Sequence, residues 1–225
     1  MLIDSFLFFK ELDLLEIRLN YLYPYVDQFI IIEACQSFTG KRKKFNFENN
    51  IQRYRKFLNK ITYYKIHDFH KSSKDLYEYL QKIESKRLIL NMMKSHKYYD
   101  KNILHWVLDS YHRECIHIPI QDICKENDFL IISDLDEIPS IKVINEIKNN
   151  QFHSFPIVCK QYEFKYYLNS LHKPNWLGSI IAPYSFLKNK SFNNLRRNSI
   201  DLEVANSGGY HFTSVGGIKV LKEKI

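Results

Sequence analysis

The sequence has few cysteines and no long apolar run. Its four cysteines form no CxxC pair, which excludes the common zinc and redox motifs. A chain of this length needs no disulfides to fold and has no recognisable secretory leader. We therefore expect free, mostly buried thiols, a reducing compartment and a cytoplasmic location. Charged residues interrupt the apolar amino terminus, so we predict no transmembrane segment and leave peripheral membrane contact open.

The sequence also lacks a polar linker, an internal repeat and a low-complexity tract. With 45% hydrophobic and 15% aromatic residues it can bury one sizeable core, and we predict a single domain over residues 1–225. The formal net charge of +8 suits an anionic partner, such as a nucleic acid, an acidic membrane surface or a phosphorylated small molecule. Charge alone does not choose among these partners.

Strand and helix patterns alternate along much of the chain. Apolar runs at residues 3–9 and 29–32 predict strands, and the leucines between them have helical spacing. This β-α-β unit should have parallel, adjacent strands, so we predict an α/β fold with a mostly parallel central sheet flanked by helices. Further helices are predicted at 48–58, 76–94, 104–116 and 141–147, and further strands at 61–66, 129–133, 155–159, 164–168 and 210–215.

The most apolar strand, residues 129–133, runs directly into the acidic segment DLDE. In an extended chain Asp134 and Asp136 project to the same side, so two carboxylates share one small volume. They repel each other unless a cation is present, and hard ions such as Mg²⁺ or Mn²⁺ prefer oxygen ligands, usually together with phosphate oxygens. Ligands of open α/β sheets bind at the carboxyl ends of strands, which is where this pair lies.

Two other functions fit parts of the sequence. An apolar strand followed by Asp-x-Asp also opens the haloacid-dehalogenase-like phosphatases, in which the first Asp is the nucleophile. Only about ninety residues follow the motif here, without the further acidic pair of those enzymes. A basic nucleic-acid-binding module could use residues 41–44 and Arg196-Arg197, which would explain the charge but not the DLDE strand. We do not expect a nucleic acid as the partner.

Two further residues are candidates for the site. His211 lies in GGYHFTSVGG, where glycines allow close backbone approach, and its imidazole could complete a metal shell or bond within the core. Arg113 lies on the helix before the acidic strand and could pair with a diphosphate or lie on a solvated face. The residues alone leave both choices open.

With these segments in view, the chain resembles the β-1,4-mannosyl-glycoprotein β-1,4-N-acetylglucosaminyltransferases, glycosyltransferase family 17. The segments that carry the resemblance are DSFLFFKELDLLEIRLNYL (4–22), FTGK (38–41), Arg113, SDLDEIP (133–139) and GGYHFTSVGG (208–217). The resemblance implies a GT-A-like fold, a UDP-N-acetylglucosamine or related UDP-sugar donor, a glycan acceptor, a Mn²⁺ or Mg²⁺ ion and inversion at the anomeric carbon.

The resemblance also implies roles for individual residues. The expected metal ligands are Asp134, Asp136 and His211, and the expected donor-binding residues are Glu11, Glu33, Arg113 and Asp134. A carboxylate base should assist attack by the acceptor hydroxyl. Glu137 is our candidate because it adjoins the metal pair, and the alternatives are Glu163, Asp201 and Glu203.

The chain departs from the family in three ways. Tyr210 stands where relatives often have a Trp before the late His, and the chain ends at Ile225, where we expect further helical sequence. The carboxyl-terminal end is therefore a candidate truncation. The membrane anchor of Golgi relatives is absent, which weakens the expectation of a glycoprotein acceptor. A truncated, inactive glycosyltransferase that only binds nucleotide is a third alternative.

Overall fold

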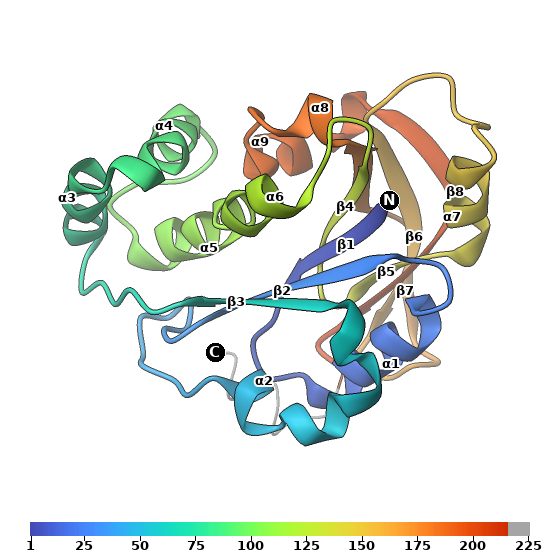
Figure 1. The fold of residues 1–225 in the computed structure, drawn as a ribbon, viewed down its shortest axis with the longest axis horizontal. Coiled ribbons are helices and arrows are strands. Elements are labelled where there is room, and N and C mark those ends of the chain that lie inside the picture. The colour runs from blue at the N-terminus through green and yellow to red at the C-terminus, as the bar shows by residue number, and fades with distance from the viewer. Residues whose placement is uncertain (216–225) are drawn as a thin grey trace.

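A computed structural model of the protein describes residues 1–215. These residues contain an eight-stranded sheet with the strand order β3-β2-β1-β4-β7-β6-β8-β5 (Figure 1). The strands are β1 (Leu2–Leu7), β2 (Gln28–Ala34), β3 (Ile61–Ile66), β4 (Phe129–Asp134), β5 (Glu137–Pro139), β6 (Ile157–Lys165), β7 (Leu171–Pro183) and β8 (Glu203–Thr213).

The sheet has a parallel half and a mixed half. Strand β1 pairs in parallel with β2 and with β4, and β2 pairs in parallel with β3. In the other half β6 and β8 are parallel, whereas β7 is antiparallel to β4 and β6, and β5 is antiparallel to β8. The predicted α/β class with a mostly parallel sheet is therefore confirmed. Since β2 and β4 lie on opposite sides of β1, the strand order reverses beside β1, which is where open sheets bind ligands.

Helices cover both faces of the sheet (Figure 1). One face carries α1 (Leu12–Leu22), α2 (Asn46–Asn49), a 3₁₀ segment (Ile51–Lys60) and α7 (Ile141–Lys148). The other carries α3 (Ser73–Lys82), α4 (Arg87–Ser95), α5 (Leu104–Glu114), α6 (His117–Ile123), α8 (Tyr184–Leu187) and α9 (Phe192–Arg197). Short 3₁₀ turns at Glu84–Lys86 and Ser199–Asp201 connect neighbouring elements.

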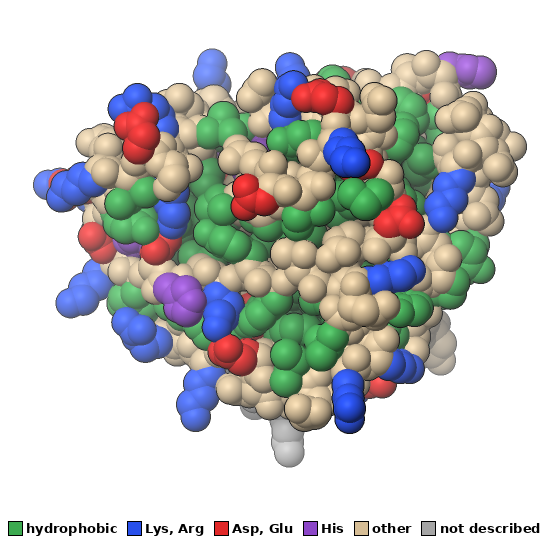
Figure 2. Space-filling view, in the orientation of Figure 1, with side chains coloured by type: hydrophobic (Ala, Val, Ile, Leu, Met, Phe, Trp, Pro, Cys, Tyr) green, Lys and Arg blue, Asp and Glu red, His purple; other side chains and the backbone are tan. Residues whose placement is uncertain are grey.

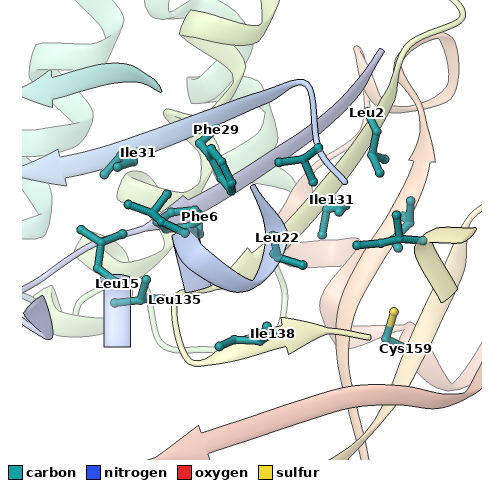
Figure 3. Close-up of a cluster of buried hydrophobic side chains, with 14 of the residues drawn as sticks. Leu2, Phe6, Leu15, Leu22, Phe29, Ile31, Ile131, Leu135, Ile138 and Cys159 are labelled. Atoms are coloured by element: carbon teal, nitrogen blue, oxygen red, sulfur yellow. The ribbon is translucent and has the colours of Figure 1, made fainter. Parts of the chain in front are cut away.

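Alternation along the central strands builds an apolar core on each face of the sheet. On β2, Phe29 and Ile31 pack toward α1, whereas Ile30 and Ile32 pack toward α5 and its neighbours. Figure 3 shows Phe29 and Ile31 in the first of these cores, together with Leu15 of α1. Both cores reach the ends of β1, β2 and β4, so the loops that follow these strands start from rigid positions.

Two predicted helices differ from the structure. The segment predicted at 48–58 is mostly 3₁₀, and its buried residues are Tyr54 and Phe57, while Leu58 is exposed. A spacing of three residues suits the 3₁₀ period, which the helical prediction overlooked. The segment predicted at 76–94 is broken, because α3 ends at Lys82 and α4 begins at Arg87.

The strands after α7 differ more. The two strands predicted at 155–159 and 164–168 are one strand, β6, and β7 was not predicted because its first half is exposed and has no alternation. The sequence also predicts tight turns at the glycine pairs on either side of residues 210–215, but β8 runs through Gly208 and Gly209. Gly209 has φ +129°, and a Cβ there would lie 2.1 Å from the carbonyl oxygen of Ile138, so the two chains touch at this point. The second glycine pair, Gly216 and Gly217, lies outside the described residues.

Several general predictions can be compared with the structure. All four cysteines are free, three of them buried and Cys124 half-buried, as predicted. Within residues 1–215 no helix has the length and apolarity needed to cross a bilayer. The single domain over residues 1–225 and the cytoplasmic location stay predictions.

Candidate active site

A cavity opens at the carboxyl ends of β1, β2 and β4, beside the reversal of strand order. It lies where α/β sheets place their ligands. The residues that line it are Leu7, Phe8, Phe9, Glu11, Ile32, Ala34, Gln36, Ser37, Phe38, Lys43, Asp109, His112, Arg113, Asp134, Leu135 and Asp136. The cavity thus has an aromatic end, near Phe38, and a charged end, at the DLDE segment.

The aromatic end of the cavity is formed by Phe38 and His112. Their ring centroids are 5.5 Å apart, and Phe38 is 36% exposed, so part of its ring is open to a ligand. Burial lowers the pKa of His112 to about 3, so its imidazole is neutral at pH 7. A neutral aromatic pair of this kind suits a flat, uncharged ring such as a nucleobase.

A fully buried arginine, Arg18 of α1, supports the DLDE turn from below. Its guanidinium makes two hydrogen bonds to Asp4 of β1, at 2.6 and 2.8 Å, and one to the Ser133 hydroxyl. Its Nη1 also donates to the backbone carbonyl oxygens of Asp134, Leu135 and Glu137, at 2.8 to 3.1 Å. Arg18 therefore ties strand β1, strand β4 and the turn into one unit.

The first carboxylate of the motif, Asp134, is held by two arginines. Its Oδ1 accepts from Arg113 of α5 at 2.5 Å, and its Oδ2 accepts from Arg196 of α9 at 3.1 Å. Burial alone would raise the pKa of Asp134. The two guanidinium groups oppose this effect, and the net pKa is well below its usual range. Asp134 is thus a permanent anion with both oxygens engaged.

The second carboxylate, Asp136, faces His211 of β8. The chain turns at Leu135 and Asp136 instead of staying extended, so the two motif carboxylates reach different partners. Asp136 Oδ1 lies 3.7 Å from His211 Nε2, and the backbone N–H of Phe212 donates to the Asp136 carbonyl oxygen at 2.9 Å. Burial raises the pKa of Asp136, and it lowers that of His211, but the Asp136, Glu137 and Glu163 carboxylates raise the His211 pKa overall.

The spacing of Asp136 and His211 fits a divalent cation whose remaining ligands come from outside the protein. An ion about 2.1 Å from each of two ligands holds those ligands about 3–4 Å apart, which agrees with the 3.7 Å between the two atoms. Among residues 1–215 no group of three or more His, Cys, Asp and Glu side chains could hold a metal alone. Phosphate oxygens and water would therefore have to complete the shell, as is usual for Mg²⁺ at phosphate sites.

The structure corrects the proposed role of Glu137. Its side chain is fully buried and does not line the cavity. The carboxylate accepts two hydrogen bonds from Arg196 and one each from the Trp176 indole and the Asp134 backbone N–H. Burial raises the pKa of Glu137, but Arg196 and His211 together bring the net pKa below its ordinary value. A carboxylate with four donors and a lowered pKa is a structural anchor and a poor general base.

The other predicted residues lie in different places. Glu11 lines the cavity at the start of α1. Glu33 does not: its buried carboxylate accepts from Lys43, Tyr63 and the backbone N–H groups of residues 46 and 47, so it anchors α2. Among the alternative bases, Asp201 is exposed and Glu203 accepts from Ser154, and neither lines the cavity. Glu163 instead faces His211.

Sequence reasoning missed the roles of two arginines. Arg18 occupies the apolar face of its helix together with Leu15, Leu19 and Leu22, and a charge at that spacing was a signal that it is buried with a partner. Arg196 was considered for nucleic-acid binding, but its side chain is 16% exposed and is paired with Asp134 and Glu137. No pattern in the sequence links residue 196 to the DLDE segment.

A buried glutamate, Glu114, fixes α9 against α5. It accepts hydrogen bonds from the Ser191 hydroxyl at 2.6 Å and from the backbone N–H groups of residues 192 and 193, and it lies 3.1 Å from His96. Because Arg113 is next to Glu114 on α5 and Arg196 is on α9, this contact helps to set the distance between the two arginines that hold Asp134.

We expect the stability of the protein to fall in acid partly through Glu114. Burial raises its pKa, but the neighbouring His117, His96 and Ser191 side chains hold the pKa far below the ordinary value of 4.5 for a glutamate. The unfolded chain therefore takes up this proton first as the pH falls below about 4.5, and the folded state loses stability. Urea unfolding between pH 2.5 and 6 should show this slope, and Glu114→Gln should flatten it by up to about 1.4 kcal/mol per pH unit. An unchanged slope would contradict the assignment.

Comparison with known families identifies the amino-terminal part of the chain. The sequence model of glycosyltransferase family 17 matches residues 1–104, which include β1, α1, β2 and Phe38 of the cavity, but not His112. Residues 1–104 match glycosyltransferase family 17. This confirms the predicted resemblance over that part and supports a glycosyltransferase. The DLDE segment and His211 lie beyond the matched residues.

Two other comparisons add little. A crystal structure of mouse xyloside xylosyltransferase 1 in its apo form is similar at 12% identity and a TM-score of 0.38, covering 92% of this chain and 77% of that chain. A likeness at this level does not bear on the substrate or the mechanism. No curated protein matches the chain.

Proposed function

We propose that this protein is a metal-dependent, inverting glycosyltransferase that transfers N-acetylglucosamine or a related sugar from a UDP-sugar to a glycan hydroxyl. One observation carries the proposal. The cavity at the reversal of strand order combines an aromatic end with a charged end, where Arg113 and Asp136 line the cavity and His211 faces Asp136. The match of residues 1–104 to glycosyltransferase family 17 supports the same class of reaction and a GT-A-like organisation.

The donor lies along the cavity with its base at the aromatic end. Phe38 and the neutral His112 contact the uracil ring, and the half-buried Glu11 bonds to the nucleoside from the start of α1. The diphosphate lies toward Arg113, whose guanidinium can donate to phosphate oxygens while it remains paired with Asp134. Asp134 orients Arg113 and, through it, the donor.

Asp136 and His211 would hold a Mn²⁺ or Mg²⁺ ion together with the diphosphate. When bound, such an ion would supply positive charge against the negative charge of the leaving diphosphate. Two arginines complete the arrangement. Arg113 donates to the same diphosphate, and the Arg18 hydrogen bonds keep the DLDE turn rigid. Preorganised charge of this kind lowers the barrier without reorganisation during the reaction.

Two alternatives fit less well. A phosphatase would use Asp134 as its nucleophile, but both oxygens of Asp134 are bonded to arginines, which makes the carboxylate a weak nucleophile. A nucleic-acid-binding module would need free basic groups, but Arg196 and Lys43 are both in ion pairs. On the face drawn in Figure 2, the Lys and Arg side chains are scattered among acidic ones and form no continuous stripe.

The test is hydrolysis of a panel of UDP-sugars, measured as UDP release with Mn²⁺ and with EDTA. We expect release that requires the metal, is fastest with UDP-N-acetylglucosamine and yields the sugar with inverted anomeric configuration by NMR. GDP-sugars and para-nitrophenyl phosphate serve as controls for the base and for phosphatase activity. Release that is equal in EDTA, or faster phosphate release from para-nitrophenyl phosphate, would overturn the proposal.

A further inference from the structure

The histidine opposite Asp136 has a second carboxylate on its other edge. His211 Nε2 lies 3.7 Å from Asp136 Oδ1, and His211 Nδ1 lies 3.8 Å from Glu163 Oε1. The imidazole thus stands between two carboxylates from different parts of the chain. Glu163 and His211 are direct partners in the parallel pairing of β6 with β8, so their side chains project from the same face of the sheet.

The Glu163 edge of this arrangement is incomplete. His211 Nδ1 and Glu163 Oε2 are both buried without a hydrogen-bond partner, and each side chain is only 8% exposed. Buried polar atoms are nearly always bonded, so unpaired ones call for an explanation. At 3.8 Å the two groups are too far apart for a hydrogen bond but close enough that a small shift would make one.

The ring has little freedom to turn away from Glu163. The Trp176 ring lies against it with centroids 4.6 Å apart, and the Trp176 indole is itself fixed by a 2.8 Å hydrogen bond to Glu137. The Phe212 backbone N–H bonds to the Asp136 carbonyl oxygen and so fixes the strand beside the turn. His211 therefore keeps Nε2 toward Asp136 and Nδ1 toward Glu163.

We propose that Glu163 is a positioning residue that holds His211 as a metal ligand by accepting a hydrogen bond from its Nδ1–H. This inference rests on the proposed function, in which a divalent cation binds at Nε2. An imidazole that gives its Nε2 lone pair to a cation carries its proton on Nδ1, and that proton needs an acceptor. Glu163 is the carboxylate at that edge, and a bond to its Oε1, the oxygen 3.8 Å away, would give Nδ1 the partner it lacks.

The experiment measures the affinity for Mn²⁺ in the presence of saturating UDP, from the electron paramagnetic resonance signal of free Mn²⁺. We expect Glu163→Ala to weaken Mn²⁺ binding about 10- to 100-fold. Glu163→Gln should lose less Mn²⁺ affinity than Glu163→Ala, because its amide oxygen can still accept a hydrogen bond from His211 Nδ1–H. The matched control is Glu203→Gln, on the neighbouring strand and bonded to Ser154, which should bind Mn²⁺ like the parent.

A second measurement reports the bond itself. In the diamagnetic Mg²⁺ and UDP complex, ¹⁵N NMR of His211 should show the proton on Nδ1 in the parent protein, and Glu163→Ala should weaken this preference. Thermal unfolding without metal identifies any variant that does not fold. If Glu163→Ala does not fold, the Mn²⁺ affinity of Glu163→Gln and the His211 tautomer in the parent protein test the role of Glu163.

Two results separate failure of this inference from failure of the proposed site. If Glu163→Ala binds Mn²⁺ as tightly as the parent while His211→Ala loses it, the role of Glu163 is wrong and the metal site stands. If His211→Ala also keeps full affinity, or the parent binds no Mn²⁺, the metal site itself is wrong.

Discussion

Arg18→Met should destabilise the protein by about 3–5 kcal/mol, measured as the free energy of unfolding in urea. Methionine fills much of the volume but removes the cation that, among residues 1–215, is bonded to the fully buried Asp4 carboxylate. It also removes the donor for three backbone carbonyl oxygens of the DLDE turn. A buried charge without its partner cannot regain hydration. Most of the lost stability therefore comes from the unpaired Asp4 carboxylate and the unbonded carbonyl oxygens of the turn.

Arg53→Met is the matched control for this substitution. Arg53 bonds to Asp13 and Glu16 on the outer side of α1, and its side chain is 35% exposed. Exposed ion pairs contribute little because water screens them, so we expect a change of at most about 1 kcal/mol. The double variant Asp4→Leu with Arg18→Met should recover part of the loss, since no unpaired charge is left. Equal effects of the two arginine substitutions would contradict the assigned role of Arg18.

Asp136→Asn should lower Mn²⁺-dependent UDP-sugar turnover at least about 100-fold, whereas Asp134→Asn should mainly lower stability. The two carboxylates have different partners: Asp136 faces His211, and Asp134 bonds to Arg113 and Arg196. An amide at 136 is a weaker ligand for a hard cation, so metal binding suffers first. An amide at 134 leaves two partly buried guanidiniums with less counter-charge, which should cost about 1–3 kcal/mol of unfolding free energy.

The measurement is a comparison of the two variants for Mn²⁺ affinity with UDP, turnover and urea unfolding. We expect Asp134→Asn to keep Mn²⁺ affinity within about 10-fold of the parent, and Asp136→Asn to unfold at nearly the parent's urea concentration. The pattern would be reversed if Asp134 were the principal ligand. Such a reversal would also remove His211 from the metal shell, because Asp136 is the motif carboxylate that faces its Nε2, at 3.7 Å.

The parallel half of the fold was predictable because its patterns are local. The helix α1 was predicted from leucine spacing between the first two strands, and β3 was predicted at residues 61–66 as observed. In the mixed half β7 was not predicted, and β6 and β8 were predicted only in part, because these strands are held by pairing with distant strands and by glycine contacts. Gly208 and Gly209 look like a turn in the sequence, and only the chain packed against them explains why they are in a strand.

The candidate site divides in the same way. The sequence predicted a carboxylate pair at the end of an apolar strand, where sheets bind ligands, and both Asp134 and Asp136 line the cavity. It left Arg113 open between a diphosphate contact and a solvated face, and the structure places Arg113 on the cavity wall. Which carboxylate faces the histidine did not follow, because the chain turns at residues 135 and 136, and alternation in an extended strand does not hold there. The assignment of Glu137 as base failed for a related reason, since its partners Arg196 and Trp176 are distant in sequence.

By itself the sequence determined the α/β class, the β-α-β unit, the position of the acidic turn and the resemblance to family 17, since these depend on periodicity and on contiguous motifs. Only the tertiary structure decided the charge pairing around that turn. Arg18, Arg113, Arg196, Glu163 and His211 come from five different elements, and which anion meets which cation depends on strand register and helix packing. Burial then converts those pairings into strong preferences, because a buried charge that misses its partner has no water to replace it.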